Sequence, residues 1–136
     1  MKAFFDTNVV ASALDPDSPE KCQVSRELLR THRAEGTAVI STQVLLETFR
    51  VCVGKFKLAP QDAKSHVQDL MSLEIVVVRT DAIIDAIDLV ITNQIAVWDA
   101  MILSAALSAK CSTVYSEDMQ DGFRVRGLTV VNPFRE

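Results

Sequence analysis

The sequence has no apolar run that approaches the roughly 18 residues a membrane-spanning helix needs. Its start lacks a basic region followed by an apolar segment and a cleavage site, so no secretory signal is expected. The 136 residues also contain no repeats, no low-complexity tracts and no plausible interdomain linker. The chain is therefore expected to be a single cytoplasmic domain, residues 1–136, that makes no membrane contact.

Cysteine, histidine and positive charge are also scarce. Cys22, Cys52 and Cys111 are an odd number of thiols without a C-x-x-C spacing, which argues against a disulfide framework or a zinc site and predicts buried side chains. His32 and His66 occur in polar helical surroundings and are expected at the surface. The formal charge of -4 gives no electrostatic signature of nucleic-acid binding. It does not exclude such binding, because cations bound by clustered carboxylates would reverse the local field.

Short apolar segments alternate with helical patterns along the chain. Strands are expected just before Asp6 and over residues 38–40, 75–78, 113–116 and 128–131, the last two separated by a loop at 117–127. Helices are expected over residues 19–34, 43–55, 60–73 and 98–110, and a stripe of isoleucines at 83, 84, 87 and 91 marks another. Because strands that alternate with helices form β-α-β crossovers, the fold class is α/β, with three layers and a central, mainly parallel sheet flanked by helices.

The residue patterns also predict which of these elements are buried. The run from Ile75 to Val78 is continuous and β-branched, as in a strand covered on both faces. Residues 98–110 are apolar nearly all round, which predicts a helix in the middle of the domain. Asp81, Asp85 and Asp88 recur opposite the isoleucine stripe and are expected to form a solvated surface.

The first strand ends abruptly at a carboxylate. In KAFFDTNVV, residues 2–10, the apolar run stops at Asp6, Thr7 and Asn8. Asp6 would therefore lie at the carboxyl end of a strand, where open α/β sheets bind their ligands. A carboxylate in that place is costly unless a cation meets it. The alternative is that Asp6 or Asn8 caps the turn that follows.

Three further acids occupy comparable places. Glu47 lies one turn inside the helix that begins VLLETF, where a solvent-facing side chain is the alternative. Asp99 opens the most apolar helix of the chain, either as a ligand or as a first-turn acid. Asp118 follows the strand at 113–116, although SEDMQDG could equally be a polar turn closed by Gly122. A parallel sheet brings strand ends and helix starts to one edge, which favours a common role.

Converging carboxylates repel, so such a cluster must be protonated, paired with Arg or Lys, or bound to a metal ion. The basic residues show no spacing that would pair them systematically with these acids. Oxygen ligands without nearby His or Cys favour Mg²⁺ or Mn²⁺ over zinc. Mg²⁺ held by a few carboxylates keeps several waters and accepts phosphate oxygens, so phosphate-ester chemistry is the natural use.

The sequence resembles PIN-domain ribonucleases, and in particular the VapC-type toxins of bacterial toxin-antitoxin pairs. The resemblance is carried by FFDTNVV at the start, Glu47 within STQVLLETF, VWDAMILSAAL around Asp99, and TVYSEDMQDG leading to LTVVNPF. These motifs span essentially the whole chain in the order of the family. Residues 54–73 match the family less well, and dimer contacts and substrate preference depend on regions of that kind.

The resemblance implies a Mg²⁺- or Mn²⁺-dependent endoribonuclease in which Asp6, Glu47, Asp99 and Asp118 are the catalytic, metal-binding acids. Asn8 and Ser116 match family positions that support those carboxylates by hydrogen bonding, and Asp121 is expected to assist. It further implies a homodimer and a small cognate antitoxin whose carboxy-terminal segment occupies the acidic groove. Candidate contacts to the RNA backbone are Arg50, Lys55, Lys57, Arg124 and Arg126.

Other classes of protein fit the sequence less well. A phosphoacceptor signalling domain would have a pair of acids after the first strand and a Lys after a late one, but only Asp6 occurs and Ser116 ends the late strand. A haloacid-dehalogenase phosphatase would need a second Asp where Asn8 stands. A non-catalytic metal-binding or interaction module of the same fold is an open alternative.

Overall fold

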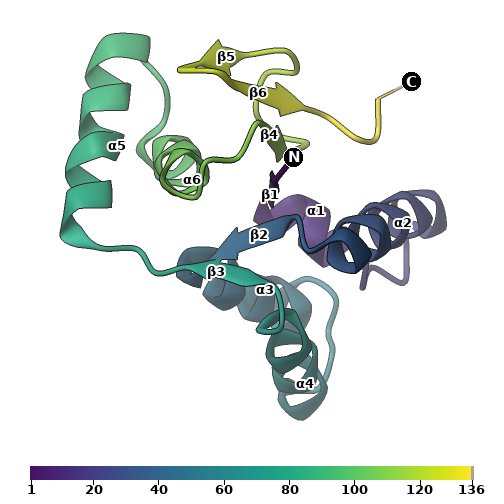
Figure 1. Ribbon diagram of the computed structural model, residues 1–136. Helices are drawn as coiled ribbons and strands as arrows, with labels where there is room; N and C mark the ends of the chain where they lie inside the picture. Colours follow the sequence, from purple (N-terminus) through teal and green to yellow (C-terminus); the bar gives the residue numbers. More distant parts are fainter. Residues whose placement is uncertain (136) are drawn as a thin grey trace.

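Figure 1 shows the computed structural model, which describes residues 1–135. The elements in chain order are β1 (Ala3–Phe5), α1 (Thr7–Ser12), α2 (Pro19–Glu35), β2 (Ala38–Ser41), α3 (Thr42–Gly54), α4 (Pro60–Leu70), β3 (Glu74–Val76), α5 (Thr80–Asn93), α6 (Val97–Ser108), β4 (Thr113–Tyr115), β5 (Arg124–Val125) and β6 (Leu128–Val131). Strands and helices alternate through most of the chain, as the sequence predicts.

The strands form one sheet in the order β3-β2-β1-β4-β6-β5. All neighbouring pairs are parallel except β5 with β6, which confirms the mainly parallel sheet. β1 lies inside the sheet, and its three residues are almost completely buried. Phe5 of β1 pairs with Tyr115 of β4, so the next residues, Asp6 and Ser116, leave the sheet side by side.

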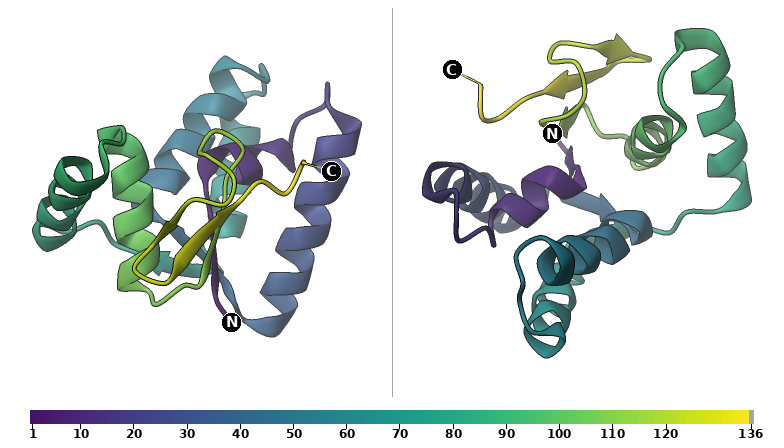
Figure 2. Two further views of the ribbon diagram at one scale, coloured as in Figure 1. Left: turned by 90° about the horizontal axis from the view of Figure 1, so that it is seen from above. Right: turned by 180° about the vertical axis from the view of Figure 1, so that it is seen from behind.

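Helices flank the sheet in layers. Figure 1 shows α5 and α6 on one side of the strands and α1 and α2 on the other, and the rear view in Figure 2 shows the same separation. α3 and α4 pack against each other, and α3 also packs against α1 and β2. This arrangement confirms the three-layer α/β prediction.

α6 is the core helix of the domain. Seven consecutive residues from Ala100 to Ala106 are buried, as the apolar composition of this segment predicts. No single helix within residues 1–135 is long and apolar enough to cross a membrane. Taken together, α5 and α6 have the length and composition of a broken membrane span, with a bend of 119° between them. The core helix of a soluble protein can have the same length and composition, so this pair is weak evidence for a membrane span.

Local signals set the ends of several helices. Pro19 occupies the first turn of α2, where its missing N–H costs nothing, and Gly36 ends that helix with a left-handed φ of 71°. The Ser41 side chain accepts a hydrogen bond from the Val44 N–H at 3.3 Å and so caps α3. These boundaries lie within one or two residues of the predicted ones.

A short helix that was not predicted, α1, follows β1, and the Asp6 side chain caps it, as the alternative for Asp6 expects. Two local predictions were wrong. β3 is an edge strand with partly exposed residues, not a strand covered on both faces, since it pairs only with β2. The loop at 117–127 contains β5, which Gly127, at a φ of 84°, turns back onto β6.

The isoleucine stripe of α5 faces solvent rather than the core. Ile84 and Ile91 are 60% and 70% exposed, while Ala86 and Leu89 make the buried face. The stripe is helically spaced as predicted, but a different face of α5 is buried, and α5 packs against α6. Asp85 is also not simply solvated, because the Arg126 guanidinium pairs with its carboxylate at 2.8 Å.

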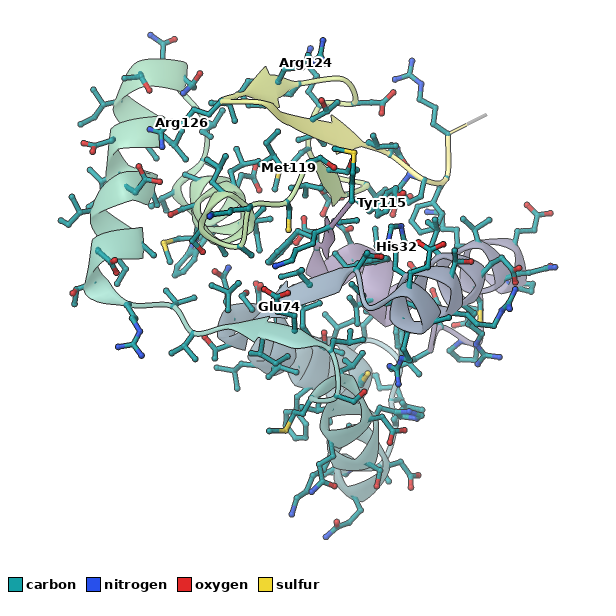
Figure 3. All side chains as sticks on the ribbon, in the orientation of Figure 1. His32, Glu74, Tyr115, Met119, Arg124 and Arg126 are labelled. Atoms are coloured by element: carbon teal, nitrogen blue, oxygen red, sulfur yellow. The ribbon has the colours of Figure 1, made fainter. Side chains whose placement is uncertain are left out.

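An aromatic group joins α2 to the sheet. Figure 3 shows His32 and Tyr115 near each other, and their rings are 5.7 Å apart, with Phe5 in contact with both. The His32 Nδ1 also lies 2.7 Å from the Thr37 hydroxyl. His32 is therefore half-buried, and so is His66, which corrects the prediction that both lie at the surface. Cys52 and Cys111 are buried as predicted, whereas Cys22 is only half-buried.

Candidate functional site

A cleft of about 380 Å³ opens where β1 and β4 end and where α3 and α6 approach them. Asp6, Glu47, Asp99 and Asp118 all line it, although they come from four separate segments of the chain. The parallel sheet explains why they meet, because the carboxyl ends of adjacent parallel strands lie at one edge. The sequence-based expectation that these four acids lie close together is therefore met in the structure.

Asp6 is the most buried of the four acids, with 8% of its surface exposed. One carboxylate oxygen accepts a hydrogen bond from the Thr7 N–H at 2.7 Å, and the other accepts one from the Ser116 hydroxyl at 2.8 Å. Burial raises the pKa of Asp6 from 3.8 to about 6, and the charges of Glu47 and Asp99 add to that effect. The two hydrogen bonds oppose the rise because they favour the charged form.

Glu47 is held in place by two neighbours. Its Oε1 accepts a hydrogen bond from the Thr7 hydroxyl at 3.1 Å and another from the Gln43 side-chain amide at 3.2 Å. Thr7 thus contacts both Asp6 and Glu47, through its backbone and its side chain respectively. Sequence reasoning missed Thr7 and Gln43, although a polar residue four positions before Glu47 on the same helix face could have indicated the second contact.

Asp99 occupies the first turn of α6 and faces the cleft. Burial and the nearby charge of Asp118 raise the pKa of the Asp99 carboxyl above its ordinary value. The N-terminal end of a helix stabilises a carboxylate and so opposes that rise. The Asp99 and Asp6 carboxyls are thus both harder to ionise than usual while no cation lies between them.

Among the residues that the structure describes, no lysine or arginine forms an ion pair with this cluster. Within residues 1–135, none of the ion pairs involves Asp6, Glu47, Asp99 or Asp118. The donor set is made of carboxylate oxygens without His or Cys, which fits a hard divalent cation such as Mg²⁺. In the described part of the chain, no three His, Cys, Asp or Glu side chains lie as close as the ligands of one ion.

The supporting residues differ in what they contact. Ser116 donates to Asp6, as the sequence predicts. The Asn8 side-chain oxygen instead accepts a hydrogen bond from the Glu117 N–H at 3.1 Å, so it fixes the loop after β4 rather than a carboxylate. Asp121 is not among the described residues that line the cleft. It accepts a hydrogen bond from the Asn132 N–H at 2.8 Å, because the loop folds back on the segment after β6.

An ion pair at the rim of the cleft was not predicted from the sequence. Lys21 of α2 pairs with Glu117, and both line the cleft. The Lys21 ammonium also lies 5.4 Å from the centre of the Phe134 ring. Lys21 therefore fastens the loop after β4, which carries Asp118, to α2. Their separation of 96 positions left no local pattern to indicate the pair.

Of the basic residues proposed to contact RNA, Lys55 lines the cleft. Arg124 and Arg126 are held elsewhere, since Arg124 donates to the Thr129 hydroxyl at 3.3 Å and Arg126 pairs with Asp85. Figure 3 shows both arginines at the β5–β6 hairpin. Arg50 and Lys57 are not among the described residues of the cleft.

The family model of the PIN domain matches residues 3–125. The chain belongs to the PIN domain family. The match includes all four cleft acids. A search of curated proteins finds no match to this PIN domain.

Solved structures share the fold at low sequence identity. A toxin-antitoxin complex from Klebsiella pneumoniae is 18% identical, with a TM-score of 0.73 over 99% of this chain and 100% of that one. VapC20 from Mycobacterium tuberculosis, a toxin that cleaves the sarcin-ricin loop, is 14% identical, with a TM-score of 0.69 over 86% and 90%. VapBC2 from Rickettsia felis, bound to a DNA fragment from its promoter, is 22% identical, with a TM-score of 0.69 over 96% and 97%. This PIN domain therefore has the fold of VapC-type toxins.

Proposed function

We propose that this PIN domain is a Mg²⁺- or Mn²⁺-dependent endoribonuclease that acts in the cytoplasm as the toxin of a toxin-antitoxin pair. The observation that carries the proposal is the single cleft lined by Asp6, Glu47, Asp99 and Asp118 within a PIN fold. The likeness to VapC20, which cleaves RNA of the sarcin-ricin loop, supports the choice of substrate class. The whole chain would act as one nuclease domain.

Asp6 and Asp99 would hold the metal ion, with Glu47 and Asp118 completing the site. When bound, Mg²⁺ or Mn²⁺ would lower the pKa of a coordinated water and neutralise charge on the phosphate. Asp6 suits the central role because its two hydrogen bonds fix the direction of its carboxylate. The raised pKa values of Asp6 and Asp99 mean that each must lose any proton it carries before it can act as a ligand.

Neighbouring polar residues position two of these acids, Asp6 and Glu47. Ser116 donates to Asp6, and Thr7 and Gln43 donate to Glu47, so each carboxylate is oriented before substrate arrives. Hydrolysis by water needs no participation of the ribose 2′-hydroxyl. The expected products therefore carry 5′-phosphate and 3′-hydroxyl ends.

Metal-dependent cleavage of RNA tests the proposal. The purified protein is incubated with single-stranded RNA in Mg²⁺ or Mn²⁺, with EDTA as the control, and the ends of the products are sequenced. We expect cleavage with either metal and none in EDTA. Cleavage that persists in EDTA, or metal binding without any cleavage, would contradict a metal-dependent nuclease; the second result would identify a non-catalytic metal-binding module.

A cognate antitoxin is the second part of the proposal. The structures from Klebsiella pneumoniae and Rickettsia felis are toxin-antitoxin complexes with the same fold. In this chain the cleft carries four acids without a direct cationic partner among residues 1–135. A cationic segment of an antitoxin would neutralise that charge and block access of RNA to the same acids.

A homodimer is the third part, and the exposed isoleucine face of α5 offers a surface for it. Ile84 and Ile91 are 60% and 70% exposed, and Ile87 is 43% exposed. We expect Ile84→Asp to raise the dimer dissociation constant about tenfold or more, because a charge buried without a partner is costly. Analytical ultracentrifugation measures the effect, and Met71→Asp, at an exposed apolar residue away from α5, is the control. Equal dissociation constants for Ile84→Asp and the wild type would place the interface elsewhere.

A further inference from the structure

Trp98 is the only tryptophan of the chain, and it precedes the cleft acid Asp99 at the start of α6. Its side chain lines the cleft, yet 67% of its surface is exposed. By contrast, Phe4 and Phe5 are completely buried in the core. The packing of the domain therefore leaves most of Trp98 in contact with solvent, and within residues 1–135 no hydrogen bond joins its indole to the four cleft acids.

The cleft around Trp98 is mixed in chemistry. Its acids come from β1, α3, α6 and the loop after β4, whereas Val51, Lys55 and Phe56 line it from the C-terminal end of α3. One site thus offers metal-binding oxygens, apolar and aromatic surface, and two lysines, of which Lys21 is paired with Glu117. A nucleotide presents matching groups, because its phosphate suits the metal and the ammonium of Lys55 while its base has a flat apolar face.

We propose that Trp98 stacks on a nucleobase of the RNA next to the phosphate that is cleaved. The inference rests on the proposed function and adds to it a residue that binds the substrate through its base. Stacking on an aromatic side chain tolerates any base, since every base has a π-face. Trp98 would therefore favour single-stranded, unstacked RNA over a duplex, whose bases are already stacked.

Trp98 lies at the start of α6, which holds its backbone in a fixed place beside the cleft acids. The residues that follow it in the helix are buried from Ala100 onward, so the helix start is anchored to the core. Trp98 and Asp99 are consecutive in the helix, so the backbone keeps the ring within a limited range of distances from the Asp99 carboxylate. A base held on the ring would keep the neighbouring phosphate close to the acids.

Fluorescence offers a direct test, because all tryptophan emission of the protein comes from Trp98. The wild-type protein is titrated with a single-stranded RNA oligonucleotide in Ca²⁺, and a gel checks that the RNA stays intact. An abasic oligonucleotide of the same length and charge serves as the control. We expect the RNA to quench the emission and the abasic chain to quench it little. Equal changes with both ligands, or none with RNA, would overturn the proposal.

Kinetics of variants provides the second test. Trp98→Ala is expected to raise KM for RNA about 5- to 150-fold with little change in kcat, which is the range measured for loss of one stacked base. Trp98→Phe keeps an aromatic face and should stay within about threefold of the wild type. Met71→Ala removes an exposed apolar side chain that neither lines the cleft nor lies on α5, and should leave KM unchanged. A KM for Trp98→Ala equal to that of the wild type would overturn the proposal.

The outcomes separate this inference from the proposed function. If the wild type cleaves no RNA in Mg²⁺ or Mn²⁺ but its emission responds to bases, the nuclease proposal fails and base stacking stands. If it cleaves RNA without base-dependent quenching, the nuclease proposal stands and the role of Trp98 fails. Emission that changes on dilution of the protein and not with RNA would place Trp98 in a contact between copies of the chain, and would also overturn the inference.

Discussion

Replacement of Asp99 by asparagine is expected to lower the rate of RNA cleavage at least about 10³-fold, because the variant loses a charged oxygen ligand and several kcal/mol of charge stabilisation with it. Asparagine keeps the size of the side chain, so the start of α6 should remain folded. Asp99→Ala and Asp6→Ala should abolish cleavage in the same way. The measurement is the initial rate on a labelled RNA in Mg²⁺, together with circular dichroism to verify the fold.

Asp88→Asn is the matched control for this experiment. Asp88 is an exposed aspartate on α5, and it is not among the described residues of the cleft. The control variant should cleave at the wild-type rate. If Asp99→Asn cleaves RNA as fast as the control, Asp99 is not a catalytic residue. The assignment of the acidic cleft as the active site would then be wrong.

The second large effect is on stability. Asp6→Asn is expected to raise the free energy of unfolding of the metal-free protein at pH 7 by up to about 3 kcal/mol, because the rise of the Asp6 pKa from 3.8 to about 6 measures the cost of its buried charge. Asparagine can still accept the hydrogen bond from Thr7. The same substitution should abolish cleavage, so activity and stability would move in opposite directions.

The pH dependence follows from the direction of this shift. The pKa of Asp6 is higher in the folded protein than in the unfolded chain, so the folded state binds the proton more strongly. The stabilisation that results is fully present below pH 3.8 and is lost as the pH rises through about 6. Wild type and Asp6→Asn should therefore be closest in stability well below pH 3.8 and differ most at pH 7.

Urea unfolding in EDTA at several pH values measures this difference, and Asp88→Asn again controls for removal of an exposed charge. Taking the difference between wild type and variant cancels the titration of other groups, provided they do not interact with Asp6. Added Mg²⁺ should raise the free energy of unfolding of the wild type, since the ion replaces the proton on the carboxylate. The difference in free energy of unfolding between wild type and Asp6→Asn should then become smaller. A variant that is no more stable than the wild type at pH 7 would show that Asp6 is not strained by its burial.

The sequence predicts the fold well because its signals are local and consistent. Apolar runs mark the strands, Pro19 and Gly36 bound α2, and the composition of α6 predicts its burial. Two features escape this reasoning because they depend on neighbours in space. β3 is an edge strand although its residues suit a central one, and the isoleucines of α5 face solvent because the buried face uses Ala86 and Leu89.

The acids of the site could be located because strand ends and helix starts are readable in the sequence and a parallel sheet gathers them. Their partners could not be predicted in the same way. Thr7 contacts Glu47 across 40 positions, and Lys21 contacts Glu117 across 96. Only the folded chain brings these residues together.

The supporting residues show the limit of resemblance. Asn8 occupies a position expected to support a carboxylate, but it accepts from the backbone of the loop after β4. Asp121 closes that loop against the segment after β6 instead of joining the acids. Both contacts still act on the cleft indirectly, because the loop carries Asp118.

The central claim is that acids from distant parts of the chain share one divalent ion. A crystal structure of the protein with Mn²⁺, with anomalous scattering to locate the metal, tests it most directly. The account predicts a Mn²⁺ ion within about 2.3 Å of carboxylate oxygens of both Asp6 and Asp99. A cleft without Mn²⁺ at a concentration that saturates cleavage, or an ion bound away from these two residues, would contradict it.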